Sequence, residues 1–316
     1  MDVIGIGNLC VDYIMEIDRL PATDEFADTL SHSCQGGGRV ANALSVLGRL
    51  GSAAQMFGIT GDDLYGQFCK RDLEEQGVDV SKIITQAGAN SNFCVVLAEK
   101  STGGRSIVRQ FGTCRKLQAE ELPEDSIYGA RFLHLADMGP VSVRAAELMR
   151  KSGGTVVMDA DEFDPEIEAH MNLIDIFICA KQYYNSLFPS CDYEEGLRRI
   201  IARGPHTAIV TLGSKGCAGV SREGYFRLPC FPVEVVDSTG AGDVFHGAYI
   251  YGELQGWCAK ESARFASAVS AIKCTVLGGR AGIPNLKMVQ DFIQSGTFDD
   301  TELRRRSEMY RRAPAR

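Results

Sequence analysis

The chain has 316 residues, of which 45% are hydrophobic, and this suffices for one large domain, with or without a small appendage. A formal net charge of −8 disfavours binding to nucleic acid or to anionic membranes, and no apolar run approaches the roughly 20 residues of a membrane helix. The 11 cysteines contain no C-x-x-C pair, which fits neither a zinc site nor a disulfide framework and favours reduced thiols in a cytoplasmic protein. The first ten residues lack the basic start of a signal peptide and are typical of a strand.

Short apolar runs alternate with helix-length segments along most of the chain. Runs without polar alternation are typical of strands buried on both faces. The predicted buried strands are residues 3–6, 54–59, 132–136, 155–158, 174–179 and 208–212. The predicted helices are residues 40–50, 64–76, 141–151, 193–202, 241–252 and 260–275. This order predicts an α/β domain with a mostly parallel sheet and helices on both sides.

Four other segments interrupt that order and predict a separate small sheet. Residues 93–99 and 105–111 flank the turn Ser101-Thr102-Gly103-Gly104, which is typical of a β-hairpin. Residues 9–17 and 26–33 have the pattern of strands with one polar face. A sheet of these four strands at one edge of the α/β domain would form a lid.

These segments predict a division of the chain into three parts. Residues 1–8, 35–89 and 115–300 form the α/β core that binds nucleotide and substrate. Residues 9–34 and 90–114 form the lid. Residues 301–316 form a tail, whose last 13 positions hold six arginines and few apolar residues, so we expect a frayed helix or an unstructured end there.

The segment Asp237-Ser238-Thr239-Gly240-Ala241-Gly242-Asp243 carries the most chemical information. Its glycines permit a tight turn, and the turn leads into the apolar helix predicted to begin at Ala241. Backbone N–H groups at a helix N-terminus bind anions, so the segment predicts a phosphate cradle. A carboxylate beside such a cradle is useful as a base that takes the proton of an attacking hydroxyl, although Asp243 could equally stabilise the first helical turn.

This segment closely resembles the D-T-x-G-A-G-D signature of the PfkB/ribokinase family of carbohydrate kinases. The resemblance implies a ribokinase-like three-layer αβα sandwich with a mostly parallel sheet and a β lid. It also implies that Asp243 is the catalytic base and that Gly240, Ala241 and Gly242 form the anion hole for the transferred phosphoryl group. By the same resemblance Thr239, Gly240 and Gly242 contact the nucleotide.

A second glycine-rich segment, Gly36-Gly37-Gly38-Arg39-Val40-Ala41-Asn42, lies upstream. Taken alone it indicates only a strand-to-helix connection. It resembles the family's G-G-x-x-x-N motif, which implies that Gly37, Gly38 and Asn42 bind the sugar, with Arg39 where many relatives have Lys. Asp12 matches the strand-end aspartate that bonds sugar hydroxyls in the family; without the resemblance it would be read as a solvated edge-strand carboxylate.

Further segments resemble the nucleotide side of the family. Thr211, Gly213 and Gly216 match a T-x-G-x-x-G nucleotide loop that would otherwise be a plain tight turn. Residues 274–284 resemble the loop that closes over the adenine. In several relatives this loop and the first aspartate of the signature bind a monovalent cation, so Asp237 is a candidate K⁺ ligand as well as a candidate turn former.

One family feature is absent. Many members carry N-x-x-E, whose glutamate organises Mg²⁺, but the corresponding residues are Ala180-Lys181-Gln182-Tyr183. Asp159 and Asp161 could compensate, or they are solvated carboxylates at a strand end. Two lid arginines, Arg105 and Arg109, could reach an anionic substrate or stay solvated, as could Arg115 beyond the hairpin. His246, one turn past Asp243, is expected to be a packed helix residue.

The resemblance therefore predicts an ATP- and Mg²⁺-dependent kinase that phosphorylates a hydroxyl, by resemblance a primary one, of a sugar or sugar-like molecule. The stretch from Ser238 to Asn285 looks most like ketose and keto-sugar kinases. The alternatives are a nucleoside kinase and a catalytically weak nucleotide- or sugar-binding regulatory protein. A dinucleotide dehydrogenase is disfavoured, because Cys10 occupies the third glycine position of G-x-G-x-x-G. Relatives often pair through their lids, which predicts a homodimer.

Overall fold

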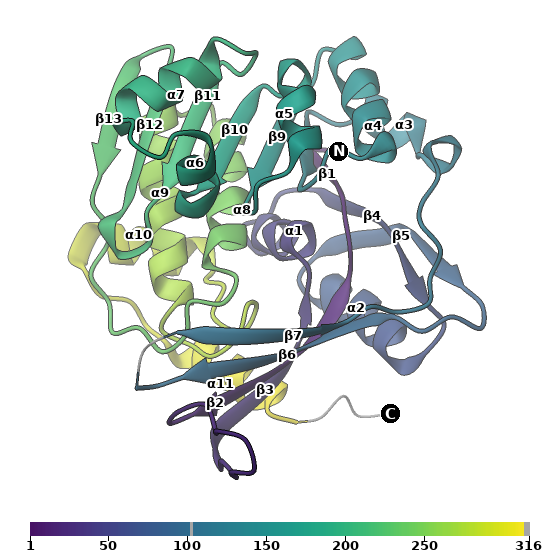
Figure 1. Ribbon diagram of the computed structural model, residues 1–316, viewed down its shortest axis with the longest axis vertical. Helices are drawn as coiled ribbons and strands as arrows, with labels where there is room; N and C mark the ends of the chain where they lie inside the picture. The colour runs from purple at the N-terminus through teal and green to yellow at the C-terminus, as the bar shows by residue number, and fades with distance from the viewer. Residues whose placement is uncertain (102–103, 313–316) are drawn as a thin grey trace.

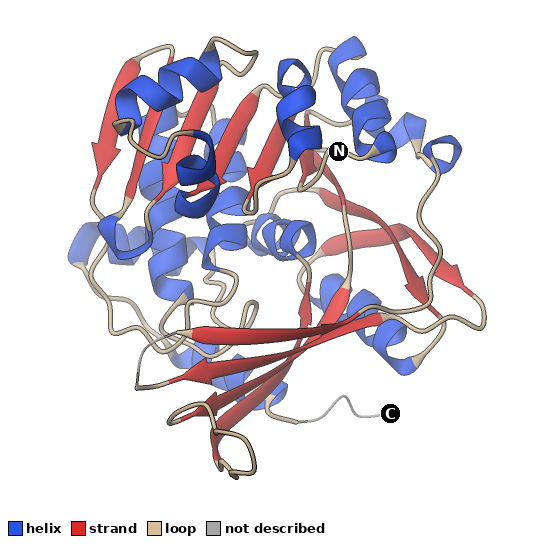
Figure 2. Cartoon of the chain, viewed as in Figure 1, coloured by secondary structure: helices blue, strands red, loops and turns tan. Residues whose placement is uncertain are grey.

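A nine-stranded sheet with helices on both faces forms the larger part of the molecule, and a four-stranded sheet stands off one end of it (Figures 1 and 2). This computed structural model describes residues 1–101 and 104–312. The large sheet has the strand order β13-β12-β11-β10-β9-β8-β1-β4-β5. All neighbours from β11 to β5 are parallel, whereas β12 and β13 are antiparallel. The prediction of an α/β fold with a mostly parallel sheet and a β lid is confirmed.

The strands of the large sheet include all six predicted buried runs. Their bounds are β1 Val3–Ile6, β4 Ala54–Gly61, β5 Val78–Gln86, β8 Phe132–Leu135, β9 Thr155–Ala160, β10 Ile176–Ala180, β11 Thr207–Thr211, β12 Cys217–Ser221 and β13 Gly224–Leu228. The sequence reading missed β5, β12 and β13. These three lie toward the sheet edges, and the alternating burial of β5 and β13 gives no continuous apolar run.

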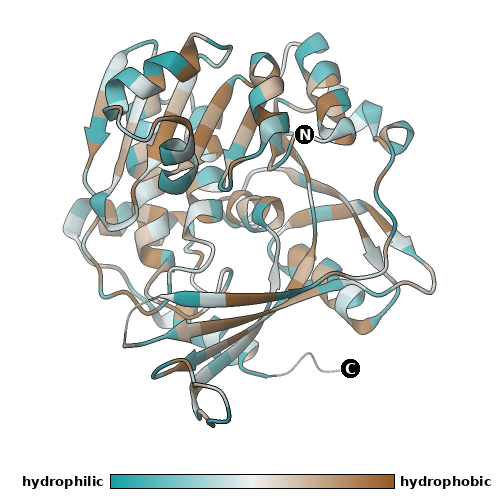
Figure 3. Ribbon diagram, in the orientation of Figure 1, coloured by the Kyte–Doolittle hydropathy of each residue, from teal (hydrophilic) through white to brown (hydrophobic). Residues whose placement is uncertain are grey.

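The helices cover the two faces of this sheet as separate groups. Their bounds are α1 Arg39–Arg49, α2 Leu64–Glu75, α3 Glu124–Tyr128, α4 Pro140–Lys151, α5 Pro165–Ala169, α6 Lys181–Leu187, α7 Tyr193–Ile201, α8 Ala241–Leu254, α9 Ala259–Lys273, α10 Leu286–Ser295 and α11 Thr301–Tyr310. One apolar core joins the sheet to α1, α2, α8, α9 and α10, and a second joins it to α3–α7. Hydrophobic residues are concentrated in the strands of the large sheet, as the ribbon coloured by hydropathy shows (Figure 3). Among the described residues, no helix is both long and apolar enough to cross a membrane.

The direction in which the chain adds strands changes beside β1. From β1 it proceeds to β4 and β5 on one side, and later to β8–β11 on the other. In open α/β sheets, ligands bind at the carboxyl ends of the strands beside such a switch point. Asp159, near the end of β9, and Gly7, just after β1, lie at this edge of the sheet.

The small sheet has the order β3-β2-β6-β7, with β2 Cys10–Ile17, β3 Thr29–Gly37, β6 Asn92–Glu99 and β7 Arg105–Gln110. The predicted hairpin of β6 and β7 is antiparallel, and its central residues Thr102 and Gly103 lie outside the described residues. Strand β3 begins and ends later than predicted. Its start is delayed past Phe26, whose side chain is 102% exposed, and it extends to Gly37 by pairing with β2.

The expectation of a frayed or unstructured tail is wrong for residues 304–310. Residues Thr301–Tyr310 form the helix α11, in which Leu303 and Arg306 are buried. The sequence reading took the arginine run as a sign of solvation, but the Arg306 guanidinium donates to the carbonyls of Arg280 and Ala281. Residues 313–316 lie outside the described part of the chain.

Candidate active site

A cleft of about 480 Å³ lies between the small sheet and the carboxyl edge of the large one. It is lined on the core side by residues from the two glycine-rich segments, and on the lid side by residues of β2, β6 and β7. The predicted site residues that line it are Asp12, Gly38, Arg39, Asn42, Thr239, Gly240 and Asp243. Segments about 200 positions apart in the sequence therefore meet at one cleft.

The glycine turn before α8 has the geometry of an anion cradle. Gly240 caps the helix with φ 73°, a left-handed conformation that a residue with a Cβ seldom adopts. The first amides of a helix have no intrahelical acceptor. The Ala241 amide donates to the Ser238 carbonyl, whereas the Gly242 amide meets no acceptor among the described residues. Gly242 is exposed, so its amide is free to donate to an incoming anion, although Gly242 is not among the residues that line the cleft.

Asp243 follows in the first turn of α8 and is held in place from α1. Its Oδ2 accepts a hydrogen bond of 2.7 Å from Nδ2 of Asn42. Removal from water and the negative charge of the nearby Asp159 raise the pKa of Asp243 to about 6. A carboxylate with that pKa is ionised at neutral pH and is still basic enough to accept a proton from a hydroxyl.

Asp159 lies at the end of β9 beneath Asp243 and is itself buried, so it is not the solvated carboxylate that one sequence reading allowed. Its Oδ1 lies 3.3 Å from Nε2 of His246 and 3.9 Å from the Arg39 guanidinium. These neighbours, His246 first, hold the pKa of Asp159 below its usual value despite its burial. His246 is packed in the core as expected, and it also provides the ring that faces this carboxylate.

The first glycine-rich segment brings the Asp12 carboxylate against the backbone. Gly37 ends β3, and a Cβ at this position would lie 2.2 Å from Oδ2 of Asp12. Only glycine therefore allows the two strands to approach with Asp12 facing the cleft. Gly38, with φ 105°, makes the turn into α1 by itself. The sequence reading placed all three glycines in the connection, but Gly36 and Gly37 belong to the strand.

A buried ion pair that the sequence reading missed fixes the orientation of Asn42. Arg280 is 1% exposed, and its Nε donates to Oδ1 of Asn42 over 2.9 Å. Its Nη1 lies 2.6 Å from Oδ2 of Asp72, and its Nη2 donates to the Gly37 carbonyl. Because the amide oxygen of Asn42 accepts from Arg280, the amide nitrogen must point toward Asp243.

The C-terminal helix supports this ion pair from behind. The Tyr310 hydroxyl donates to Oδ1 of Asp72 over 2.5 Å, and the Arg306 guanidinium bonds the Arg280 carbonyl. A signal was present in the sequence: Arg280 lies in the glycine-rich loop 274–284, and Asp72 occurs on the apolar face of a predicted helix. The loop was assigned to the adenine side and Asp72 to no motif, so nothing paired the two residues.

Thr211, Gly213 and Gly216 lie at the carboxyl end of β11, and none of them lines the 480 Å³ cleft. Gly213 and Gly216 have φ of 58° and 84°, which shape the tight turn into β12. The turn shares the carboxyl edge of the sheet with the cleft. The structure therefore places these predicted nucleotide contacts on a neighbouring part of that edge.

The residues around Asp237 do not fit a monovalent cation. Its carboxylate accepts from the amide and hydroxyl of Thr239 and from the Gly278 amide, each over 2.8 Å. Its carbonyl accepts from Nζ of Lys273, a fully buried side chain that helps to hold the pKa of Asp237 low. A permanent ammonium group therefore supplies the positive charge that K⁺ would provide if Asp237 were a cation ligand.

Oxygen ligands suited to Mg²⁺ do reach the cleft. Asp161 and Glu162, after β9, both line it, and carboxylate oxygens are the usual protein ligands of this ion. Gln182, in the place of the missing N-x-x-E motif, donates from Nε2 to Oδ1 of Asp161 over 2.6 Å. The carboxylates of the loop after β9 therefore suit Mg²⁺ as ligands.

The lid arginines differ in their surroundings. Arg105 and Arg109 of β7 line the cleft, and Arg105 Nη1 also donates to the Ser238 hydroxyl over 3.0 Å. This contact joins the lid to the glycine turn. Arg115 lies after the lid and pairs with Glu121 instead.

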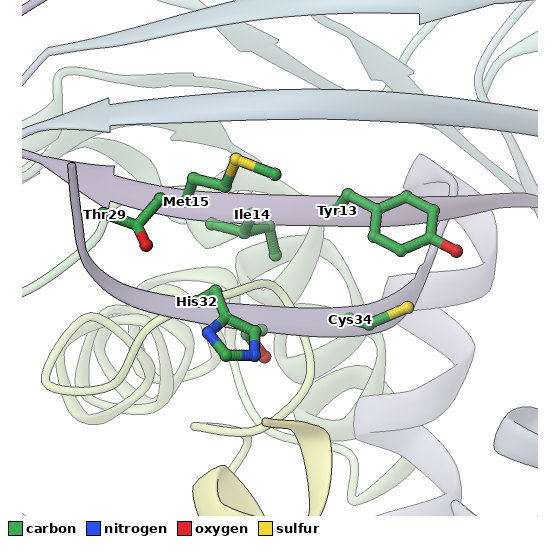
Figure 4. A pocket seen from close by; sticks show the side chains of 7 residues that line it. Tyr13, Ile14, Met15, Thr29, His32 and Cys34 are labelled. Atoms are coloured by element: carbon green, nitrogen blue, oxygen red, sulfur yellow. The ribbon is translucent and has the colours of Figure 1, made fainter. Parts of the chain in front are cut away.

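A second hollow, of about 150 Å³, lies against β2 and β3 of the lid. Tyr13, Met15, His32 and Cys34 are among its lining residues (Figure 4). Because paired residues on neighbouring strands point to the same face, Tyr13, Met15 and their partners on β3 put this hollow on the lid face opposite Asp12. It contains none of the predicted site residues.

The fold and the cleft define a ribokinase-like α/β protein with a β lid. The model of the pfkB family of carbohydrate kinases matches residues 3–286, so the chain belongs to this family and is a phosphotransferase. It is 26% identical to a nucleoside kinase of Methanothermobacter thermautotrophicus, over 90% of this chain and 93% of that protein. It is 24% identical to a 5-dehydro-2-deoxygluconokinase of Clostridium perfringens, over 97% and 96% of the two chains.

Solved structures agree on the fold. A putative ribokinase from Agrobacterium tumefaciens superposes with a TM-score of 0.84 at 22% identity, over 93% of this chain and 98% of that one. A putative ribokinase II from E. coli, solved in complex with ATP and Mg²⁺, superposes with a TM-score of 0.81 at 23% identity, over 93% and 99%.

Proposed function

We propose that the protein transfers the terminal phosphoryl group of ATP to a hydroxyl of a sugar-like acceptor, with Asp243 as the base. The observation that carries this proposal is the position of Asp243. Its carboxylate lines the cleft, has a pKa of about 6, and directly follows Gly242, whose amide meets no acceptor among the described residues. A base and an anion donor thus stand where an attacking hydroxyl and a phosphoryl group would meet.

Different residues of the cleft would bind the acceptor, accept its proton and bind the nucleotide. Asp12 and Asn42 orient the acceptor, and Asp243 takes the proton of the hydroxyl as its oxygen attacks phosphorus. The amides of Gly240 and Gly242, with the start of α8, hold the phosphate oxygens, whereas the Thr239 amide stays bonded to Asp237. The turn around Thr211, Gly213 and Gly216 accommodates the rest of the nucleotide.

Magnesium would be held near Asp161 and Glu162, and it would neutralise the charge that develops on the phosphates. The putative ribokinase II from E. coli, which has the same fold and was solved with ATP and Mg²⁺, supports the use of this ion. We infer that K⁺ is not required, because Lys273 already occupies the charge position beside Asp237.

The acceptor we propose first is a furanose-form sugar or keto-sugar with a free primary hydroxyl. Asp12, Asn42 and Arg39 present polar groups to the cleft that suit sugar hydroxyls. A nucleoside is the second candidate, because Phe93, Ile107 and Phe111 give the same cleft an apolar wall against which a base could stack. The nucleoside kinase among the relatives also supports it.

A thermal-shift screen with a non-hydrolysable ATP analogue and Mg²⁺ tests the acceptor class. A ligand in excess over its Kd stabilises the protein in proportion to the logarithm of its concentration. A hit among keto-sugars supports the first candidate, and a hit among nucleosides supports the second. Each hit is then assayed for ADP formation. Acceptor binding without turnover in wild type would favour the regulatory alternative and overturn the proposed reaction.

We also propose a homodimer that forms through the lid. The lid sheet leaves β3 and β7 as edge strands, and its exposed apolar side chains include Leu30, Val108 and Phe111. Pairing of two lids would cover these edges. Light scattering should give twice the chain mass; a monomer at micromolar concentration would exclude the dimer.

The free thiols of all eleven cysteines support a cytoplasmic location.

A further inference from the structure

Two cysteines and the acceptor-binding candidate Asp12 form a cluster at the lid side of the cleft. Cys10 and Asp12 belong to β2, and Cys94 belongs to the neighbouring β6. One ligand atom from each of the three, two sulfurs and one carboxylate oxygen, lies within 4.8 Å of the others. Cys10 Sγ is 3.3 Å from Oδ1 of Asp12, and all three residues line the cleft. The proposed reaction uses Asp12 but neither thiol.

The strand register favours a bridging ion over a disulfide. Asp12 pairs directly with Cys94, and Cys10 pairs with Asn92, so the two cysteines are diagonal neighbours. Diagonal positions in a sheet lie about 7–8 Å apart at Cα, beyond the usual disulfide limit of about 6.8 Å. A tetrahedral ion with bonds of about 2.3 Å to sulfur instead requires sulfurs about 3.8 Å apart, which the observed spacing allows.

The donor set selects the kind of ion. Two thiolates and one carboxylate suit a thiophilic divalent cation such as Zn²⁺, whereas Mg²⁺ takes oxygen ligands. Three protein ligands leave a fourth tetrahedral position open to the cleft. Arg109 pairs with Cys94 across β6 and β7, and its positive charge opposes a cation, so binding is expected to be reversible rather than structural.

We propose that Cys10, Asp12 and Cys94 form an inhibitory site for Zn²⁺ or a similar thiophilic cation, which competes with the acceptor for Asp12. Binding displaces the two thiol protons to solvent and forms two metal–sulfur bonds and one metal–oxygen bond. The competition with the acceptor rests on the proposed function, whereas the metal site itself does not.

Metal binding is tested without any enzyme assay. Titrating the full-length, reduced protein with Co²⁺ should produce one equivalent of a thiolate-to-metal charge-transfer band, which excess Zn²⁺ removes and Mg²⁺ leaves unchanged. The band should disappear in Cys10→Ser and in Cys94→Ser. Cys114→Ser, which removes a partly exposed thiol near the lid but outside the cluster, should retain it. Circular dichroism confirms that each variant is folded.

The kinetic arm uses the holoenzyme with its acceptor. Zn²⁺ should inhibit competitively against the acceptor and not against ATP, EDTA should restore activity, and the inhibition constant should rise at least tenfold in Cys94→Ser. Loss of the Co²⁺ band in Cys114→Ser but not in the two cluster variants would overturn the site. A Cys10–Cys94 disulfide in air-exposed protein without any Co²⁺ band would do the same. If no acceptor is turned over, the spectroscopic arm still decides whether the metal site exists.

Discussion

The two walls of the cleft are built differently. On the core wall, Asp243 is held by Asn42, Asn42 by Arg280, and Arg280 by Asp72, in a continuous chain of hydrogen bonds. On the lid wall, β7 presents side chains that are largely exposed, and Ile107 and the adjoining Phe111 are exposed apolar side chains. Buried charges therefore fix the core wall. Substitutions on the lid wall should change the free energy of unfolding only slightly.

The core wall therefore determines the phosphoryl-transfer step, whereas the lid wall influences which acceptor binds. The phosphoryl-transfer geometry depends on the core wall, which the family signature describes. The choice among acceptors also depends on lid positions such as Arg105, Ile107 and Phe111, which line the cleft and lie in no signature. Members of the family can therefore share the phosphoryl-transfer geometry and differ in their acceptors, and variants of the two walls should affect different kinetic constants.

The largest effect is expected for Asp243→Asn on the core wall. The substitution removes the base while the carbonyl of the new side chain can still accept from Asn42. The kcat should fall by about 10²–10⁴-fold, the usual contribution of a positioned base, and acceptor affinity should change little. In wild type, kcat/KM should fall as the pH drops below about 6, because Asp243 is then protonated. A variant with near-normal kcat would falsify the assigned base.

Asp243→Asn should also change the unfolding temperature, in a direction that depends on pH. The pKa of Asp243 is raised from 3.8 to about 6, so folding disfavours its ionised form and wild type loses stability as the pH rises through this window. Asp243→Asn should therefore unfold at a higher temperature than wild type at pH 8, and the gain should vanish at pH 4. An equal difference at both pH values would contradict the burial of this carboxylate.

The next largest effect is expected for Arg280→Met. It leaves the buried Asp72 carboxylate without its counter-ion, which costs about 3–5 kcal/mol of unfolding free energy. Urea unfolding measures the loss, and kcat should fall as well because Asn42 is no longer oriented. Arg304→Met, on the same tail helix as Arg306 but 76% exposed, is the matched surface control.

A double variant measures the interaction energy between Arg280 and Asp72. Arg280→Met with Asp72→Asn should cost less than the sum of the two single changes, because neither charge is then left alone. Additive losses would show that the two side chains act independently and would remove the proposed support of the base by the tail helix.

An intermediate effect is expected for Lys273→Met beside the glycine turn. Wild type should show equal activity in K⁺ and Na⁺, since the ammonium group is built in. The variant loses a charged hydrogen bond to the Asp237 carbonyl, worth about 1.5–3 kcal/mol, and it should regain part of its stability and activity in K⁺ but not in Na⁺. Strong K⁺ activation of wild type would show that the cation site is intact and that Lys273 does not replace it.

The smallest effect is expected for Arg105→Ala on the lid wall. The contact of Arg105 with Ser238 is exposed, and such contacts contribute about 0–1 kcal/mol. The KM for the acceptor should rise by less than about fivefold with kcat unchanged. A large fall in kcat would mean that the lid takes part in the phosphoryl-transfer step. It would contradict the assignment of this step to the core wall alone.

The sequence by itself determined the α/β core, the lid and the glycine turn. These follow from local patterns: buried parallel strands require uninterrupted apolar runs, and an anion-binding turn requires glycines at adjacent positions. Asp12, Asn42 and Asp243 could be chosen because each lies in a short motif.

Only the tertiary structure decided the partners of these residues. Asp72, Arg280 and Arg306 are separated by up to 234 positions, and nothing in the sequence near any one of them names the other two. Their burial depends on three distant segments meeting, which no local pattern encodes. The ammonium of Lys273 beside Asp237, and the thiols of Cys10 and Cys94 beside Asp12, likewise became visible only when strands and helices were placed in space.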